Sequence, residues 1–197
     1  MGVTTVRNLI TAYSLKSIAV CHKSAIKKNL DLHWKKSAYQ AAIAHAVARK
    51  IKNIDPDRAL IAGLLQGVGA LPVLMKLEES NFDDPTEQEI ELALASYTAK
   101  VGSLLAQKWE LDDELKTVIK NYANLAYDGG DEIDLVDVVN IAKLLSQIGS
   151  HDIKWPRLED SPCLRKFSAE GLTLKASLSL LKEAQEDINE VRAIFAR

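Results

Sequence analysis

Apolar residues recur at three- and four-residue intervals along nearly the whole chain, which is the spacing of one face of an α-helix. No run of alternating β-branched residues indicates a strand. The pattern predicts a first helix or helix pair over about residues 4–28, and a second helix that starts at Asp31, a good N-cap, and ends near residue 52. We therefore expect an all-α helical bundle.

Proline and capping residues predict the next boundaries. Asp55 followed by Pro56 is a cap with proline at the first helical position, and it opens a strongly apolar helix. Pro72 cannot continue a helix without a kink, so we expect a break near residues 67–71 and a restart through 74–77.

The second half of the chain has its own helix signals. Residues 86–89 read Thr-Glu-Gln-Glu, a capping box that starts a helix expected to bend near Ser96, and Asp112 caps a shorter helix. The remaining predicted elements are an apolar helix over 132–148, a loop-rich stretch over 150–171 and a final amphipathic helix over 174–195.

Length and composition are those of a soluble globular protein. The chain has 197 residues, of which 47% are hydrophobic and 26% charged, enough for one sizeable core. We find no apolar run near the roughly 18–20 residues of a membrane span and no signal peptide, so we expect a cytoplasmic protein without a membrane anchor. Cys21 and Cys163 do not form a disulfide framework, and both are expected to be reduced and buried.

Charge is unevenly distributed, although the net charge is only −2. Residues 1–53 carry ten lysines and arginines against a single aspartate. Such asymmetry is typical of an anion-binding or nucleic-acid-binding face, but basic and acidic helices that neutralise each other produce it too. We favour the second interpretation, and expect no nucleic-acid partner, because no recognisable motif or aromatic interleaving accompanies the charge.

Three motifs follow one another along the chain: Trp34-x-x-Ser37, the Gly-Leu-Leu-Gln-Gly-Val-Gly of residues 63–69, and the Val-Gly-Ser-Leu-Leu-Ala-x-x-Trp-x-Leu of residues 101–111. Together they resemble the HDOD domain, a bacterial signalling relative of the HD metal-dependent phosphohydrolases. The resemblance covers about residues 1–150 and implies a helical bundle with a regulatory role. Residues 151–197 are then a loop and a C-terminal helix packed on the same domain.

The resemblance also implies where the metal ligands of the catalytic relatives would fall. Their frame reads Gly-Leu-Leu-His-Asp-Ile-Gly, so the His and Asp positions hold Gln66 and Gly67 here. A neutral amide binds divalent metals weakly, and glycine has no side chain to offer. Together with the other implied ligand positions these residues form what we call the relic pocket: Lys36, Gln66, Gly67, Thr98, Asn121, Tyr122 and Lys143.

We expect this relic pocket to contain no catalytic residue, metal or cofactor, because none of its members is a carboxylate or an imidazole. The ammonium groups of Lys36 and Lys143 would in addition repel a cation in a dry site. The four histidines lack zinc-site spacing, and the acidic residues at 128–134 lack the pattern of a calcium loop.

HDOD domains usually begin with several helices upstream of the segment that residues 1–7 resemble. The resemblance therefore implies that these N-terminal helices are missing, and that the chain is a truncated product, a fragment or a minimal variant. The apolar positions within residues 6–20 would then be covered by the C-terminal helix, a second copy or a separate partner.

Three functions remain open. The leading hypothesis is a non-enzymatic signalling or scaffold module that binds a protein partner or self-associates. The first alternative is a divergent phosphohydrolase acting on nucleotides or cyclic dinucleotides. The second is a module that holds a phosphorylated small ligand in the relic pocket, using Lys36 and Lys143.

Overall fold

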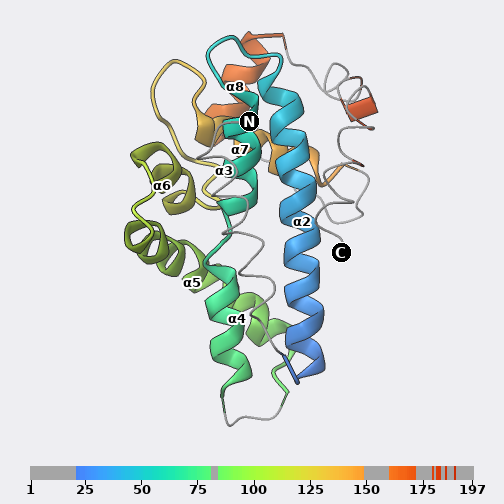
Figure 1. Ribbon diagram of the computed structural model, residues 1–197. Coiled ribbons are helices and arrows are strands. Elements are labelled where there is room, and N and C mark those ends of the chain that lie inside the picture. The colour runs from blue at the N-terminus through green and yellow to red at the C-terminus, as the bar shows by residue number, and fades with distance from the viewer. Residues whose placement is uncertain are drawn as a thin grey trace. The chain divides into compact units, whose positions relative to one another are not determined.

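The computed structural model describes residues 21–80, 84–148 and 160–171, with the separate positions 179, 181, 182, 185 and 189. Every regular element within these residues is a helix (Figure 1), so the all-α prediction is confirmed. The helices are, in chain order, α2 (Ser24–Ala48), α3 (Pro56–Leu65), α4 (Ala70–Glu78), α5 (Glu87–Lys108), α6 (Asp113–Lys120), α7 (Leu135–Leu145) and α8 (Pro162–Ala169).

The chain divides into two compact units. The first unit comprises Met1–Ser37 and Leu64–Tyr122, and the second comprises Ala38–Gly63 and Ala123–Arg197. Helices α2 and α3 contribute residues to both units. Helices α4, α5 and α6 belong to the first, and α7 and α8 belong to the second.

In the first unit, Lys23 ties the start of α2 to the end of α4. The backbone N–H of Lys23 donates to the carboxylate of Glu78 at 3.2 Å, and its ammonium donates to the carbonyls of Leu77 at 3.0 Å and Ser80 at 2.8 Å. The last carbonyls of a helix lack partners within the helix and attract positive charge. The contact therefore satisfies acceptors that α4 cannot satisfy itself.

Helix α4 also begins against α5, at a point where neither segment carries a side chain. Gly69 is the N-cap of α4, and a Cβ atom there would overlap the carbonyl oxygen of Thr98 and the backbone nitrogen of Gly102. Glycine at 69 and at 102 thus permits a backbone-to-backbone approach that a side chain would block.

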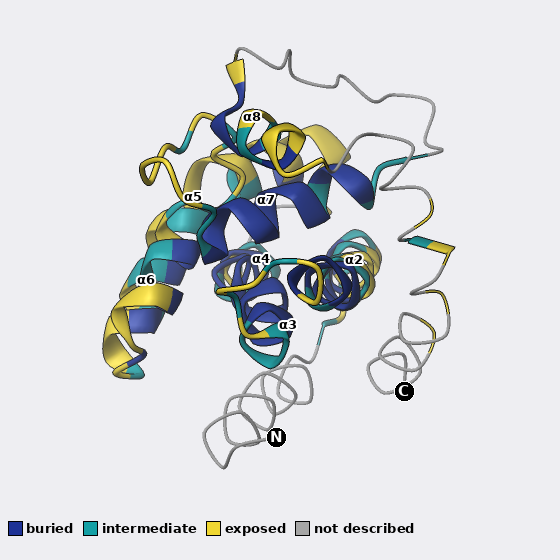
Figure 2. Cartoon of the chain, turned by 90° about the horizontal axis from the view of Figure 1, so that it is seen from above, coloured by how far each residue is buried: buried dark blue, intermediate teal, exposed yellow. Residues whose placement is uncertain are grey.

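In the second unit, α7 forms the centre of the core. Every residue of this helix except Lys143 is buried, and Figure 2 shows it dark along most of its length. Helices α2 and α3 pack closely at Gly63, where a Cβ atom would lie only 2.6 Å from the Cα of Ala41. Helix α8 packs on α7.

The prediction that a helix starts at Asp31 was wrong, because α2 begins at Ser24 and runs through that position. Ile26, Leu30 and Trp34 follow one another at four-residue spacing and are all buried. This continuous apolar stripe outweighs the local preference of aspartate for a helix start. Residues 1–20, which include most of the predicted first helix, lie outside the described residues.

The predicted caps are confirmed at three helices. Helix α3 begins at Pro56, and the carboxylate of Asp55 accepts a hydrogen bond from the N–H of Asp57 at 2.9 Å. Thr86 forms the expected capping box of α5, and Asp112 caps α6. The break after α3 falls at residues 66–69, slightly before the expected position.

Several details differ from the predictions. Pro72 lies in the first turn of α4, where its missing N–H is not needed, and α5 continues as helix past Ser96. The stretch 150–171 was expected to be loop, but it contains α8, which starts with Pro162. Cys21 is only partly buried, whereas Cys163 is buried as expected.

The predicted final helix over 174–195 falls almost entirely outside the described residues, and within it Leu181 is partly exposed. The predicted division into residues 1–150 and 151–197 stays a prediction.

The segment Pro56–Glu78, which spans α3 and α4, is apolar and long enough to cross a membrane, contrary to the expectation from the sequence. Within its apolar window, 72% of the residues are buried inside the protein. A core helix of a globular protein has the same composition, so the length and apolar composition of this segment are weak evidence for a membrane span.

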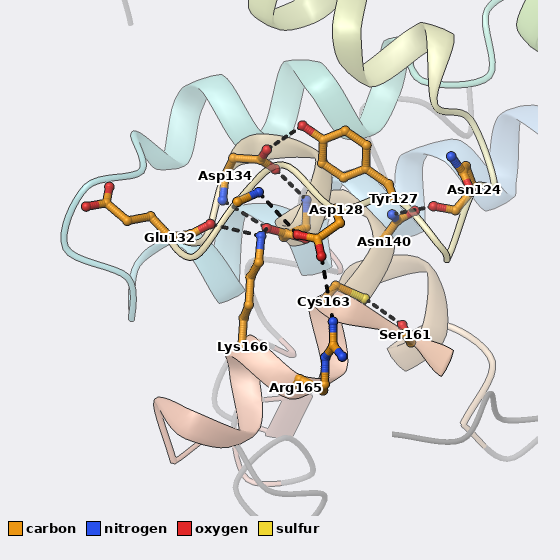
Figure 3. A network of polar contacts seen from close by, with 12 residues as sticks. Asn124, Tyr127, Asp128, Glu132, Asp134, Asn140, Ser161, Cys163, Arg165 and Lys166 are labelled. Carbon is orange, nitrogen blue, oxygen red and sulfur yellow. Dashed lines mark hydrogen bonds and ion pairs between the residues drawn. The ribbon is translucent and has the colours of Figure 1, made fainter. Parts of the chain in front are cut away.

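Two adjacent basic residues attach α8 to the segment around the start of α7 (Figure 3). The ammonium of Lys166 donates to Asp137 Oδ2 at 2.7 Å and to the carbonyl of Glu132 at 3.0 Å, and Arg165 lies 3.7 Å from Asp128. The side chains of Lys166 and Asp137 are only 10% and 0% exposed. Among the described residues, Asp137 Oδ1 has no hydrogen-bond partner.

Burial raises the pKa of Asp137, and the hydrogen bond from Lys166 opposes this only in part. The folded protein therefore takes up a proton at Asp137 before the unfolded chain does as the pH falls. It follows that protonation of Asp137 stabilises the fold, and that this contribution is complete below the ordinary pKa of 3.8.

We predict that the stability difference between wild type and Asp137→Asn changes with pH. Urea unfolding should show wild type gaining stability relative to the variant as the pH falls from about 7 to about 4. Asp128→Asn, which alters an exposed carboxylate, is the control and should show no such gain. A difference that shrinks in acid would mean that the ion pair with Lys166 outweighs burial.

Candidate functional site

Six of the seven relic-pocket residues lie in the first unit, and Lys143 lies in the second. Lys143 is on α7 and is the only residue of that helix that is not buried. The six others come from α2, from the turn between α3 and α4, from α5 and from the end of α6: Lys36, Gln66, Gly67, Thr98, Asn121 and Tyr122.

Gly67 lies directly against two rings of the first unit. A Cβ atom at this position would be 2.7 Å from Cε1 of His33, on α2, and 3.2 Å from Cε2 of Tyr122, which follows α6. The first distance is too short for a real side chain, so the imidazole would have to move. The place implied for an aspartate in the catalytic relatives is therefore filled by an imidazole and a phenol ring.

Gln66 and Thr98 are neutral and almost fully buried, each 2% exposed. The hydroxyl of Thr98 has no hydrogen-bond partner within the described part of the chain. Burying a neutral group costs much less free energy than burying an unpaired charge. The replacement of ionisable ligands by an amide and a hydroxyl thus suits a region from which water is excluded.

The remaining positions of the first unit are Asn121, Tyr122 and Lys36, and their surroundings differ. Asn121 is the C-cap of α6, and its side-chain amide donates to the carbonyl of Thr117 at 2.9 Å. Burial raises the pKa of Tyr122, so its phenol stays neutral. Lys36 is exposed on α2, so its ammonium lies in water and not in a dry site.

These residues do not fit the metal of the catalytic relatives. Divalent metals in such sites take imidazole, carboxylate or thiolate ligands, and at these positions only the neighbouring His33 supplies one. Over the described ranges no three or more His, Cys, Asp or Glu side chains are grouped so that they could hold a metal ion. The positions that hold metal ligands in the catalytic relatives are therefore occupied here by residues whose side chains bind metals weakly or not at all.

The position of His33 was not predicted from the sequence, because its spacing from the other histidines does not match a zinc site. A signal was present in the sequence, since His33 precedes Lys36 by three residues and so lies one turn away on the same side of a helix. Side chains on a helix lean toward its N-terminus. What the spacing cannot reveal is that the ring faces a glycine more than thirty residues further along the chain.

Comparison with known proteins supports the fold. Residues 1–125 match the HDOD domain family. Among solved structures the chain is similar to a candidate metal-dependent phosphohydrolase from Shewanella amazonensis SB2B, with a TM-score of 0.76 and 18% identity over 97% of this chain and 69% of that one. At this identity the similarity concerns the HD-type fold alone. Curated proteins give no match.

We predict that residues 67 and 33 are energetically coupled. Gly67→Asp should lower the free energy of unfolding by about 1–3 kcal/mol, because its Cβ displaces the imidazole and its carboxylate is partly buried. Gly67→Ala isolates the steric part, and that part should largely disappear in a His33→Ala background. Chemical denaturation of the four proteins of this cycle measures the coupling. Effects that simply add within about 0.5 kcal/mol would show that the ring does not oppose a side chain at 67.

Proposed function

Because the chain belongs to the HDOD domain family, we propose that it is a non-enzymatic bacterial signal-transduction module, a scaffold for a protein partner or for a second copy of itself. The observation that carries the proposal is the position of the His33 ring against Gly67. That ring takes the space in which a metal-binding side chain would have to stand.

The chemistry of the family's catalytic relatives supports the same conclusion. Metal-dependent hydrolysis needs a cation that activates water and neutralises developing charge on the phosphate. A cation held by His33, an amide and a hydroxyl would have no anionic ligand to offset its loss of hydration. The residues at these positions therefore suit a packed interior better than a reaction centre.

The exposed surface of helix α5 supports the proposal that the chain binds a protein partner. Three of its large apolar side chains, Leu92, Tyr97 and Leu104, are each more than half exposed. Tyr97 and Leu104 are seven residues apart and so share a face of the helix, and the ammonium of Lys100 lies 5.7 Å from the centre of the Tyr97 ring. A partner that covers this face would gain hydrophobic free energy.

We predict that the protein, purified without chelator, contains no stoichiometric iron, manganese, zinc or magnesium. It should also fail to hydrolyse nucleotides or cyclic dinucleotides when these metals are added. Elemental analysis and chromatography of the products measure both. A bound metal or an activity that Gln66→Ala removes, and that the surface variant Lys35→Ala retains, would favour the divergent phosphohydrolase instead.

We further predict that α5 contacts a protein in the native host. A photo-cross-linking residue in place of Leu104 should give a discrete adduct with a partner or with a second copy, which mass spectrometry identifies. Tyr97→Glu, on the same face, should weaken the adduct, whereas His33→Ala should not. The control carries the photo-cross-linking residue in place of Lys120, which is exposed at the end of α6. No adduct above this control at position 97 or 104 would exclude this face of α5 as the interface.

A further inference from the structure

The second unit contains an open cavity of about 470 Å³. Three segments line it: residues 50–53, which follow α2, residues 131–133, which precede α7, and the end of α8 with its C-cap, through Lys166, Ala169 and Glu170. The volume is in the range of sites that bind small molecules. No relic-pocket residue lines this cavity.

The lining of this cavity is mainly charged, with both signs in equal number. Its apolar side chains are Ile51, Ile133 and Ala169. Its charged side chains are three ammonium groups and three carboxylates, from Lys50, Lys52, Lys166, Asp131, Glu132 and Glu170. A ligand with a large apolar surface would find little to pack against.

The charges are also separated by segment. The lysines at 50 and 52 come from the end of the basic first part of the sequence, and the carboxylates at 131 and 132 come from the acidic stretch before α7. The charge asymmetry of the sequence thus gives this cavity one basic wall and one acidic wall, and α8 contributes one charge of each sign.

Lys166 is a fixed charge at this site. Its ammonium is held by Asp137 at 2.7 Å and by the carbonyl of Glu132 at 3.0 Å, and Figure 3 shows the contact with Glu132. Asp137 is fully buried, so moving Lys166 away would leave a buried carboxylate without its cation, which is strongly unfavourable. Lys166 is therefore held in place before any ligand arrives, and its positive charge is balanced by the carboxylate of Asp137.

We propose that this cavity binds a small zwitterion, a molecule with an anionic group and a separate ammonium or guanidinium group. A simple anion would be attracted by the lysines but repelled by as many carboxylates. A simple cation would be attracted by the carboxylates but repelled by the lysines. A ligand with both charges places each one against the wall of opposite sign and forms charge-assisted hydrogen bonds on both sides. This inference does not depend on the proposed function.

Three probes of the same chain length test the inference on the full protein. 6-Aminohexanoate carries both charges, hexanoate only the negative one and hexylamine only the positive one. In NMR titrations the zwitterion should bind at least about tenfold more tightly than either single-charge probe. The chemical-shift changes that the zwitterion causes should cluster at residues 50–53, 131–133 and 166–170.

Charge reversal on each wall provides the matched variants. Lys52→Glu and Glu170→Lys should each weaken binding of 6-aminohexanoate about tenfold, and both residues are exposed, so the fold should persist. Lys35→Glu makes the same charge change on an exposed part of α2 in the first unit and should leave binding unchanged. Equal binding of hexanoate or hexylamine, no binding of any probe at millimolar concentration, or equal effects of the Lys52 and Lys35 variants would overturn the proposal.

Discussion

The turn at residues 66–69 can pack as it does only because Gly67 and Gly69 carry no side chain. At Gly69 the backbone touches the backbone of α5, and at Gly67 it faces the rings of His33 and Tyr122. Both contacts are closer than a Cβ atom allows, and both join parts of the first unit that are distant in sequence. The start of α4, its packing on α5 and the surroundings of Gly67 all depend on this constraint.

The same constraint links the lack of a metal-binding side chain at residue 67 to the packing of the protein. An aspartate at 67 would be a potential ligand, but it would also need the space that the imidazole now fills. Glycine removes the ligand and makes room for the ring in one step. The neighbouring buried groups, Gln66 and Thr98, are neutral as well, so the region can stay dry without a bound cation. An aspartate restored at 67 alone would therefore clash with the imidazole and would place a carboxylate among neutral buried groups without a cation.

The second unit buries a pair of opposite charges, whereas Gln66 and Thr98 of the first unit are neutral. Lys166 and Asp137 form this buried ion pair, which ties α8 to α7, and burial is strong enough to raise the pKa of the carboxyl even beside its cation. Around the adjacent cavity the two signs are present in equal number and on separate segments. The net charge of the whole chain, which is close to neutral, hides this local order. An inference about partners from net charge alone would miss it.

Features that depend on a few neighbouring residues could be predicted from the sequence. The caps at Asp55, Thr86 and Asp112 are hydrogen bonds within one turn of the chain, so their residues predict the helix starts. The missing ligands at 66 and 67 are equally a matter of residue identity, and the order of three motifs was enough to predict the family and the all-α fold.

Contacts between distant residues were decided by the tertiary structure alone. Asp31 lies inside α2 because burial of the stripe through Ile26, Leu30 and Trp34 outweighs its capping preference. Lys36 turned out to be exposed, whereas His33, one turn earlier, faces Gly67. Identity and spacing along the chain determine which groups a helix presents, but only the packing of one segment on another determines what those groups meet.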